Sequence, residues 1–235
     1  MRDEASPTLP VRPARNLATA VVILLAVQIG LLVFRAIAFI HRIDLLQRIK
    51  EGDFVTRDEA RASDQLVAGS SALWLLAFAA TGIVWLVWQH RAQSNARELV
   101  AGSTSITPGW AVGWWFVPFA NLVKPLQAVH ELWLASAGGP RWSEQRVPPV
   151  LVVWWLAWLG FNLSGLFALS PDTTNVDALV GADRVHLVTM GLGILGASLA
   201  IWVVRSILAR QEAAIVEARR VILPPPPAPP PPPPS

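Results

Sequence analysis

The chain of 235 residues contains no cysteine and no tyrosine. Without cysteine it can form no disulfide bond, no thiolate metal site and no cysteine nucleophile. Charged residues make up only 15% of the chain, below the average of about 25% in soluble domains, whereas hydrophobic residues make up 53%. A soluble domain of this length would expose much of that apolar surface to water, so the composition indicates a membrane protein. The net charge is only +3 and the arginines do not cluster, which excludes nucleic acid as a partner.

Four apolar segments are long enough to cross a bilayer, which takes about 20 helical residues. They cover approximately residues 17–40, 67–88, 150–169 and 185–204. A fifth apolar stretch, residues 110–123, is too short for an ordinary span. The first segment is longer than the apolar region of a cleaved signal peptide, so we expect an uncleaved anchor. The sequence thus predicts an all-α integral membrane protein with four transmembrane helices.

Basic residues in the short connections predict the orientation. Arginine is frequent in three regions: the amino-terminal tail, the region between the second and third spans, and the region after the fourth span. The loop between the third and fourth spans is acidic instead. We therefore expect a multi-pass protein of the plasma membrane with both termini in the cytoplasm. The loop from His41 to Leu66 fits less well, because it contains four arginines and one lysine and lies outside in this topology.

Composition also divides the chain. Residues 1–15 are polar and predict a disordered cytoplasmic tail, residues 16–210 form the membrane domain, and residues 211–223 continue the last helix into the cytoplasm. Residues 224–235 are proline except for Ala228 and Ser235, which predicts a polyproline tail. Such a tail can bind a partner domain with an aromatic groove, or it can be a low-complexity end without a partner.

Two smaller features flank the first loop. Thr56 and Glu59 have the spacing of a capping box, which predicts a helix that leads into the second span. Arg35 lies about five residues before the end of the first span, within reach of the lipid headgroups. We expect it to anchor the helix at the interface; the alternative is a buried functional arginine.

The region between the second and third spans is rich in tryptophan. Thr107 followed by Pro108 predicts a helix start, Pro118 interrupts the helix, and Pro125 opens a second helix that extends to Ser136. The interfacial segment 107–136 is predicted to be either a re-entrant wedge or a pair of helices on the cytoplasmic interface. Indole rings prefer this interface, which predicts membrane anchors at Trp110, Trp114, Trp115 and Trp133.

Motifs for catalysis or metal binding are incomplete. His130-Glu131 begins a zinc motif, but Leu134 stands where the second histidine is required. The glycines from Gly191 to Gly196 match a nucleotide-binding pattern but lie inside an apolar span, where close helix packing explains them. We predict no catalytic residue, no metal site and no cofactor.

One set of polar residues remains as a binding-site candidate. If the segment 107–136 folds back beneath the second span, the polar side chains near the inner end of that span converge with those of the broken segment. The alternative is a solvated helix face. The candidate binding residues are Arg91, Asn95, Asn121, Lys124, Gln127 and Glu131.

Part of this region resembles a known family. The matching features are Arg91 and Asn95, the run from Pro108 to Phe116, and then Pro118, Asn121-Leu122, Lys124-Pro125, Gln127 and Glu131-Leu132-Trp133. They resemble the actinobacterial membrane family known as domain of unknown function 4328, over about residues 14–210. The chain departs from that family at His90, where such proteins often have tyrosine. The resemblance implies an integral membrane protein of an actinobacterial cell and supplies no activity.

Three functions are compatible with these features. The first is a non-enzymatic interaction or accessory component, which would engage a cytoplasmic partner through its inner face or proline tail, in contact with membrane lipids. The second is a small transporter or channel subunit that uses Asn121, Lys124, Glu131 and Asn162 along a polar path. The third is an enzyme that acts on lipid headgroups at the inner leaflet.

Overall fold

The structure is a computed structural model that describes residue 11, residues 14–167 and residues 175–222. Within these ranges the chain is helical and contains no strand. The long helices are α1 (Arg15–Glu51), α2 (Arg57–Leu99), α5 (Val150–Phe167) and α6 (Val176–Ile222). Between α2 and α5 lie α3 (Pro108–Gly113), the 3-10 turn η1 (Ala120–Leu122), α4 (Lys124–Ala135) and the 3-10 turn η2 (Trp142–Glu144).

Three of these helices, α1, α2 and α6, are long and apolar enough to cross a membrane. The chain is therefore a multi-pass membrane protein. The third predicted span corresponds to α5, which is shorter, with 18 residues, and its predicted end at Leu169 lies outside the described residues. Residues 1–10 and 12–13 of the tail predicted for residues 1–15, and the whole tail predicted for residues 224–235, also lie outside them.

The helices extend well beyond the apolar segments, because hydropathy marks contact with lipid and not the end of a helix. α1 continues through polar residues to Glu51 and ends at Gly52, whose φ of 87° is a left-handed conformation that favours glycine. The predicted capping box is confirmed: the Thr56 hydroxyl accepts from the Glu59 backbone N–H, and the Glu59 carboxylate accepts from the Thr56 N–H. Most of the expected loop between the first two spans is therefore helix.

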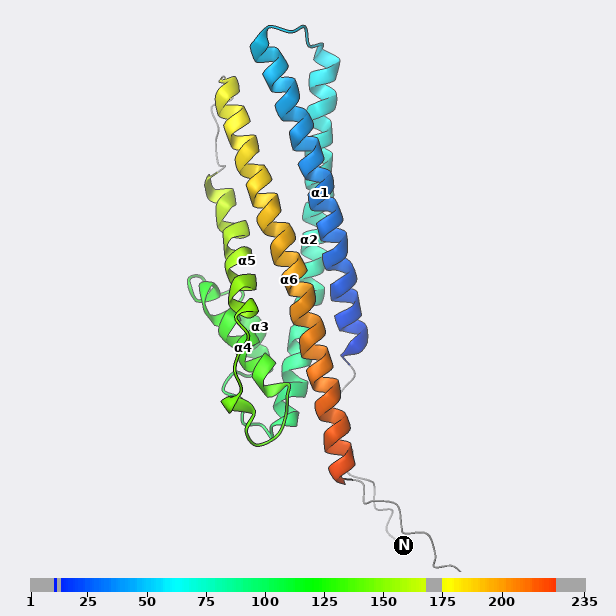
Figure 1. The fold of residues 1–235 in the computed structure, drawn as a ribbon, viewed down its shortest axis with the longest axis vertical. Helices are drawn as coiled ribbons and strands as arrows, with labels where there is room; N and C mark the ends of the chain where they lie inside the picture. The colour runs from blue at the N-terminus through cyan, green and yellow to red at the C-terminus, as the bar shows by residue number, and fades with distance from the viewer. Residues whose placement is uncertain (1–10, 12–13, 168–174, 223–235) are drawn as a thin grey trace, which may run out of the picture.

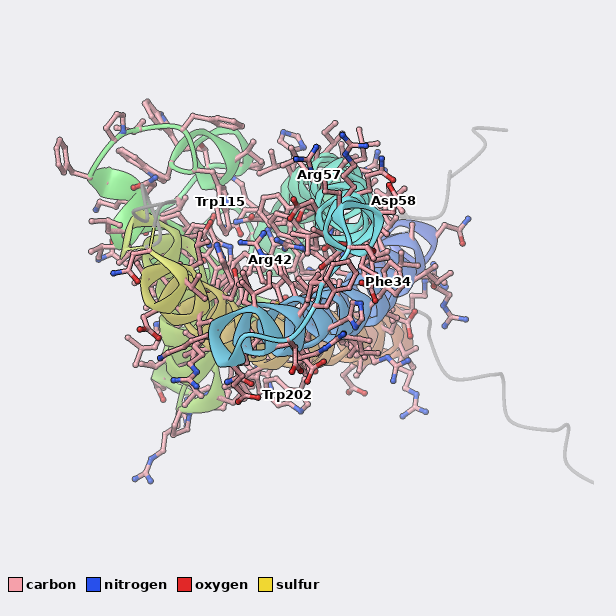
Figure 2. The ribbon with its side chains drawn as sticks, turned by 90° about the horizontal axis from the view of Figure 1, so that it is seen from above. Phe34, Arg42, Arg57, Asp58, Trp115 and Trp202 are labelled. Atoms are coloured by element: carbon pink, nitrogen blue, oxygen red, sulfur yellow. The ribbon has the colours of Figure 1, made fainter. Side chains whose placement is uncertain are left out.

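The four long helices follow one another around an interior space in the order α2, α1, α6, α5 (Figures 1 and 2). α1 packs on α2 and α6, and α6 packs on α5, whereas α2 and α5 are not packed along their lengths. Aromatic side chains bridge these two helices instead. The short helices α3 and α4 are grouped at one end of the bundle, beside the start of α5 (Figure 1).

Two buried clusters hold the bundle together. The larger one lies at the end that carries α3 and α4 and includes Trp88, Leu132, Leu151 and Ile207 from four different helices. The smaller one includes Leu32, Phe39 and Met190. The long connection between α2 and α5 is therefore part of the folded core.

Candidate functional site

The Trp-rich segment (residues 107–136) begins as its local sequence predicts. The Thr107 hydroxyl accepts from the Trp110 backbone N–H at 3.4 Å, and Pro108 occupies the first turn of α3. The chain then reverses at Phe119, whose φ of 61° is unfavourable for a residue with a side chain. α4 starts at Lys124-Pro125 and ends before Ser136. The two helices and the break between them agree with the prediction.

One buried glutamine fastens this segment to α2. The Gln89 side-chain oxygen accepts from the indole N–H groups of Trp85, at 3.1 Å, and Trp115, at 2.8 Å. Its amide nitrogen donates to the backbone oxygen of Ala111 at 3.2 Å. One turn later, Gln93 donates to the Ile106 backbone oxygen at 3.3 Å. Sequence analysis missed both glutamines, although their spacing of four residues just past an apolar run places them on one helix face.

Indole rings then connect the segment to α5. The ring centres of Trp115 and Trp158 are 5.3 Å apart in an edge-on arrangement, and those of Trp155 and Trp158 are stacked at 4.7 Å. The Trp155 indole N–H donates to the Leu122 backbone oxygen at 2.9 Å. On the α2 side, the rings of Trp85 and Trp154 are 5.6 Å apart. The Trp-rich segment therefore joins α2 and α5, which do not pack directly.

The structure places the six predicted binding residues in different surroundings. Lys124 donates to the Gln127 side-chain oxygen at 3.1 Å, so these two are brought together. The Glu131 carboxylate accepts from the backbone N–H groups of Ser105 and Ile106, the latter at 2.9 Å, and so holds the loop before α3. These three residues form the polar side of α4.

The other three lie elsewhere. Arg91 is half-buried on α2 and makes no ion pair within the described part of the chain. Asn95 is buried at a second cavity, between α2, the start of α1 and α6. The Asn121 side chain makes no hydrogen bond with a described residue and lines the interior cavity described below.

The four predicted tryptophan anchors also divide. Trp110 is 54% exposed, and its ring centre lies 4.7 Å from that of the half-buried Trp114 in a tilted arrangement. Trp115 points into the bundle (Figure 2) and bonds to Gln89. Trp133 lies under the guanidinium of Arg210, which is 3.6 Å from the ring centre and donates to the Trp133 backbone oxygen.

The bundle encloses an interior cavity of about 420 Å³. Its walls come from α1, α2, α5 and α6, and its floor comes from Trp115, Phe116 and Asn121 of the Trp-rich segment. Three of its lining residues are exposed: Gly82 on α2, Phe116 of the Trp-rich segment and Asn162 on α5. The cavity therefore opens at the surface between α2 and α5. Its volume lies within the range of about 300–1,000 Å³ of small-molecule sites.

The cavity lining is mostly apolar, with four amide or hydroxyl side chains. Gln28 donates to the Thr81 hydroxyl at 3.3 Å across the α1–α2 contact. The Asn162 amide donates to the Trp158 backbone oxygen at 2.7 Å. With Asn121, these groups give the cavity polar points on a wall of aromatic rings and small residues.

The matched family covers most of these elements. The family model described as "Domain of unknown function (DUF4328)" matches residues 51–209. The chain belongs to this family. The matched residues include α2, the Trp-rich segment, α5 and most of α6, and therefore the cavity floor and three of its walls. No curated protein and no solved structure matches the chain.

Proposed function

We propose that this DUF4328 protein is a non-enzymatic, four-span membrane protein that binds a lipid-like molecule in its interior cavity. The observation that carries the proposal is a cavity of about 420 Å³ that opens between α2 and α5. The exposed rim residues Gly82 and Asn162 lie in the apolar segments of these helices, so the opening faces the hydrocarbon of the bilayer.

A fourth span at α5 is part of this proposal. Its 18 residues correspond to about 27 Å of helix, close to the hydrocarbon thickness of about 30 Å. α5 also packs on α6, one of the long apolar helices. Four spans place the start of α1, the Trp-rich segment and the end of α6 on one side of the membrane, and the arginines of these regions favour the cytoplasmic side of the plasma membrane.

The lining of the cavity supports binding. The polar lining groups Gln28, Thr81, Asn121 and Asn162 are amides and a hydroxyl, which form hydrogen bonds but do not ionise near neutral pH. The rest of the lining is apolar, and apolar walls accept apolar guests. We therefore assign the cavity a bound molecule and no reaction.

Two glycines of α2 provide the test. A Cβ atom at Gly82, on the cavity rim, or at Gly69, outside the cavity, would meet no other group within 4 Å. A leucine therefore meets no clash at its Cβ atom at either exposed position, but only Gly82→Leu places a side chain at the opening. Native mass spectrometry of protein extracted from membranes should show co-purified lipid in the parent and in Gly69→Leu, and at least about tenfold less in Gly82→Leu. Equal lipid in all three would refute the proposal.

A second candidate function is the capture of a cytoplasmic partner. α6 extends to Ile222, well beyond the contacts of Arg210 with Trp133, and the sequence continues from there into the proline-rich residues 224–235. Cross-linked capture from native membranes, with the full chain beside a chain truncated after Leu223, tests this candidate. A stoichiometric partner that is lost on truncation would support it, and equal recovery from both chains would refute a role for the tail.

A further inference from the structure

The interior face of α1 continues past the cavity into a charged region. Gln28, Leu32, Arg35, Phe39 and Arg42 are spaced by four and three residues, so they lie in one row along the helix. The first two line the cavity, and Arg35 follows one turn beyond Leu32. On α2, Trp74 lines the same end of the cavity and lies against Arg35.

Arg35 has aromatic neighbours and no acceptor. Its guanidinium carbon is 4.8 Å from the Trp74 ring centre and 5.9 Å from that of Phe39. The Nε atom is buried, and the side chain forms no hydrogen bond or ion pair with any residue in the described ranges. The sequence suggested that Arg35 anchors the helix at the headgroups. The structure shows it half-buried against Trp74 and Phe39, with a buried Nε–H donor that has no acceptor among the described residues, which is unfavourable.

The adjacent indole has the same deficit. The Trp74 Nε1 atom is buried and finds no acceptor among the described residues. Among the described residues the one buried carboxylate, Asp183, is paired with Arg42 at 3.0 Å. The ring centres of His186 and Phe39 are 5.0 Å apart in a tilted arrangement, and the exposed Asp64 forms no ion pair in the described structure. Two neighbouring donors, one of them cationic, thus point to an acceptor that the described chain does not supply.

We propose that Arg35 and Trp74 bind the phosphate of a phospholipid whose acyl chain lies in the interior cavity. The inference rests on the proposed function, because the cavity must hold the chain. A phosphate offers several oxygen acceptors and a negative charge, and guanidinium groups bind it through paired hydrogen bonds. An acyl chain gains little by moving from bilayer to cavity, since lipid is as apolar as the protein. Selection therefore falls to the headgroup contacts.

The test compares lipids that differ in one group. Purified protein in detergent is titrated with dioleoyl phosphatidic acid, dioleoylglycerol, oleic acid or inorganic phosphate, and bound molecules are counted by native mass spectrometry. We expect phosphatidic acid to bind the parent about 10- to 100-fold more tightly than dioleoylglycerol. Inorganic phosphate or oleic acid binding as tightly as phosphatidic acid would overturn the inference, by showing a free-anion site or a carboxylate site.

Variants identify the residues. Arg35→Gln should lose the preference for phosphatidic acid but keep dioleoylglycerol, Trp74→Phe should reduce the preference about fivefold, and the exposed control Arg61→Gln should retain it. If Arg35→Gln does not fold, Trp74→Phe carries the test, because it keeps an aromatic ring beside Arg35, although a smaller one, and removes the N–H. An unchanged preference in Arg35→Gln, or in Trp74→Phe where it stands alone, would overturn the inference.

Two controls separate the competing explanations. If the parent binds neither dioleoyl lipid, the proposed cavity function fails; if it binds both equally, the headgroup inference fails alone. Asp172 lies outside the described residues, and its carboxylate is tested as a competing partner for Arg35. Asp172→Asn should leave phosphatidic acid binding unchanged, and an increase of tenfold or more would show that a protein carboxylate occupies the site.

Discussion

Replacing Gln89 with leucine tests how the Trp-rich segment is held. The side chain is fully buried and forms three hydrogen bonds, to Trp85, Trp115 and Ala111. Each such bond contributes about 0.6 kcal/mol in membrane proteins and about 1 kcal/mol in soluble ones. Gln89→Leu keeps the approximate volume but leaves three groups without partners. We expect it to destabilise the attachment of the segment by about 2–3 kcal/mol.

The absence of cysteine provides a local assay. Ala111 is fully buried in α3, so a single Ala111→Cys thiol reacts only when the segment opens. A destabilisation of about 2–3 kcal/mol should raise the labelling rate by about 30- to 150-fold. The matched control, Gln65→Leu, makes the same change at an exposed position of α2 and should leave the rate unchanged. A rate in Gln89→Leu within about twofold of the parent would refute this account of the attachment.

Three further predictions concern topology, the α2 cap and the loop before α3. If α5 spans the membrane, single cysteines at the exposed residues Ser143 and Arg184 should label from opposite sides, and labelling from one side would remove the fourth span. Thr56→Ala should cost about 1 kcal/mol at the start of α2, measured by hydrogen exchange of its first amides. Hydrogen bonds from the Thr56 backbone and hydroxyl hold the pKa of Glu59 below its ordinary value. The protection of the first α2 amides from exchange should therefore persist from neutral pH down past the ordinary glutamate pKa and disappear only at lower pH, and its loss above a pH of about 5 would contradict this. Glu131→Ala removes the acceptor of two backbone N–H groups and should raise exchange of those two amides by about tenfold or more, whereas unchanged exchange would show that the carboxylate does not hold the loop.

Local sequence signals predicted where three of the helices start. Thr56, Thr107 and Pro125 act within one helical turn, so their effects do not depend on the rest of the fold. The apolar segments 17–40, 67–88 and 185–204 lie in α1, α2 and α6, because hydropathy is also a local property of the chain. The helix lengths were underestimated, because the polar continuation of α1 to Glu51 carries no hydropathy signal.

The candidate site depended on contacts between distant segments, which the sequence does not display. Gln89 and Gln93 face the Trp-rich segment, whereas Asn95 lies about 200° further around α2 from Gln93 and faces α1 and α6 instead. The grouping of Arg91 and Asn95 with the polar face of α4 assumed that α2 presents those two residues to the segment. Only the packing of α3 against α2 decides which face of α2 contacts the Trp-rich segment.

The cavity follows from where the large and small residues lie. Trp74–Phe161 and Trp85–Trp154 pairs, with ring centres 5.7 and 5.6 Å apart, bridge α2 and α5 and keep their backbones apart. Between these pairs the walls contain small residues, including Gly82 and Gly196, which leave space unfilled. At one end of the cavity, Gly193 allows α6 to pack closely, because a Cβ there would lie 2.9 Å from the Phe161 ring and from Leu32. Rigid aromatic spacers and small wall residues together keep the space open, as the proposed lipid site requires.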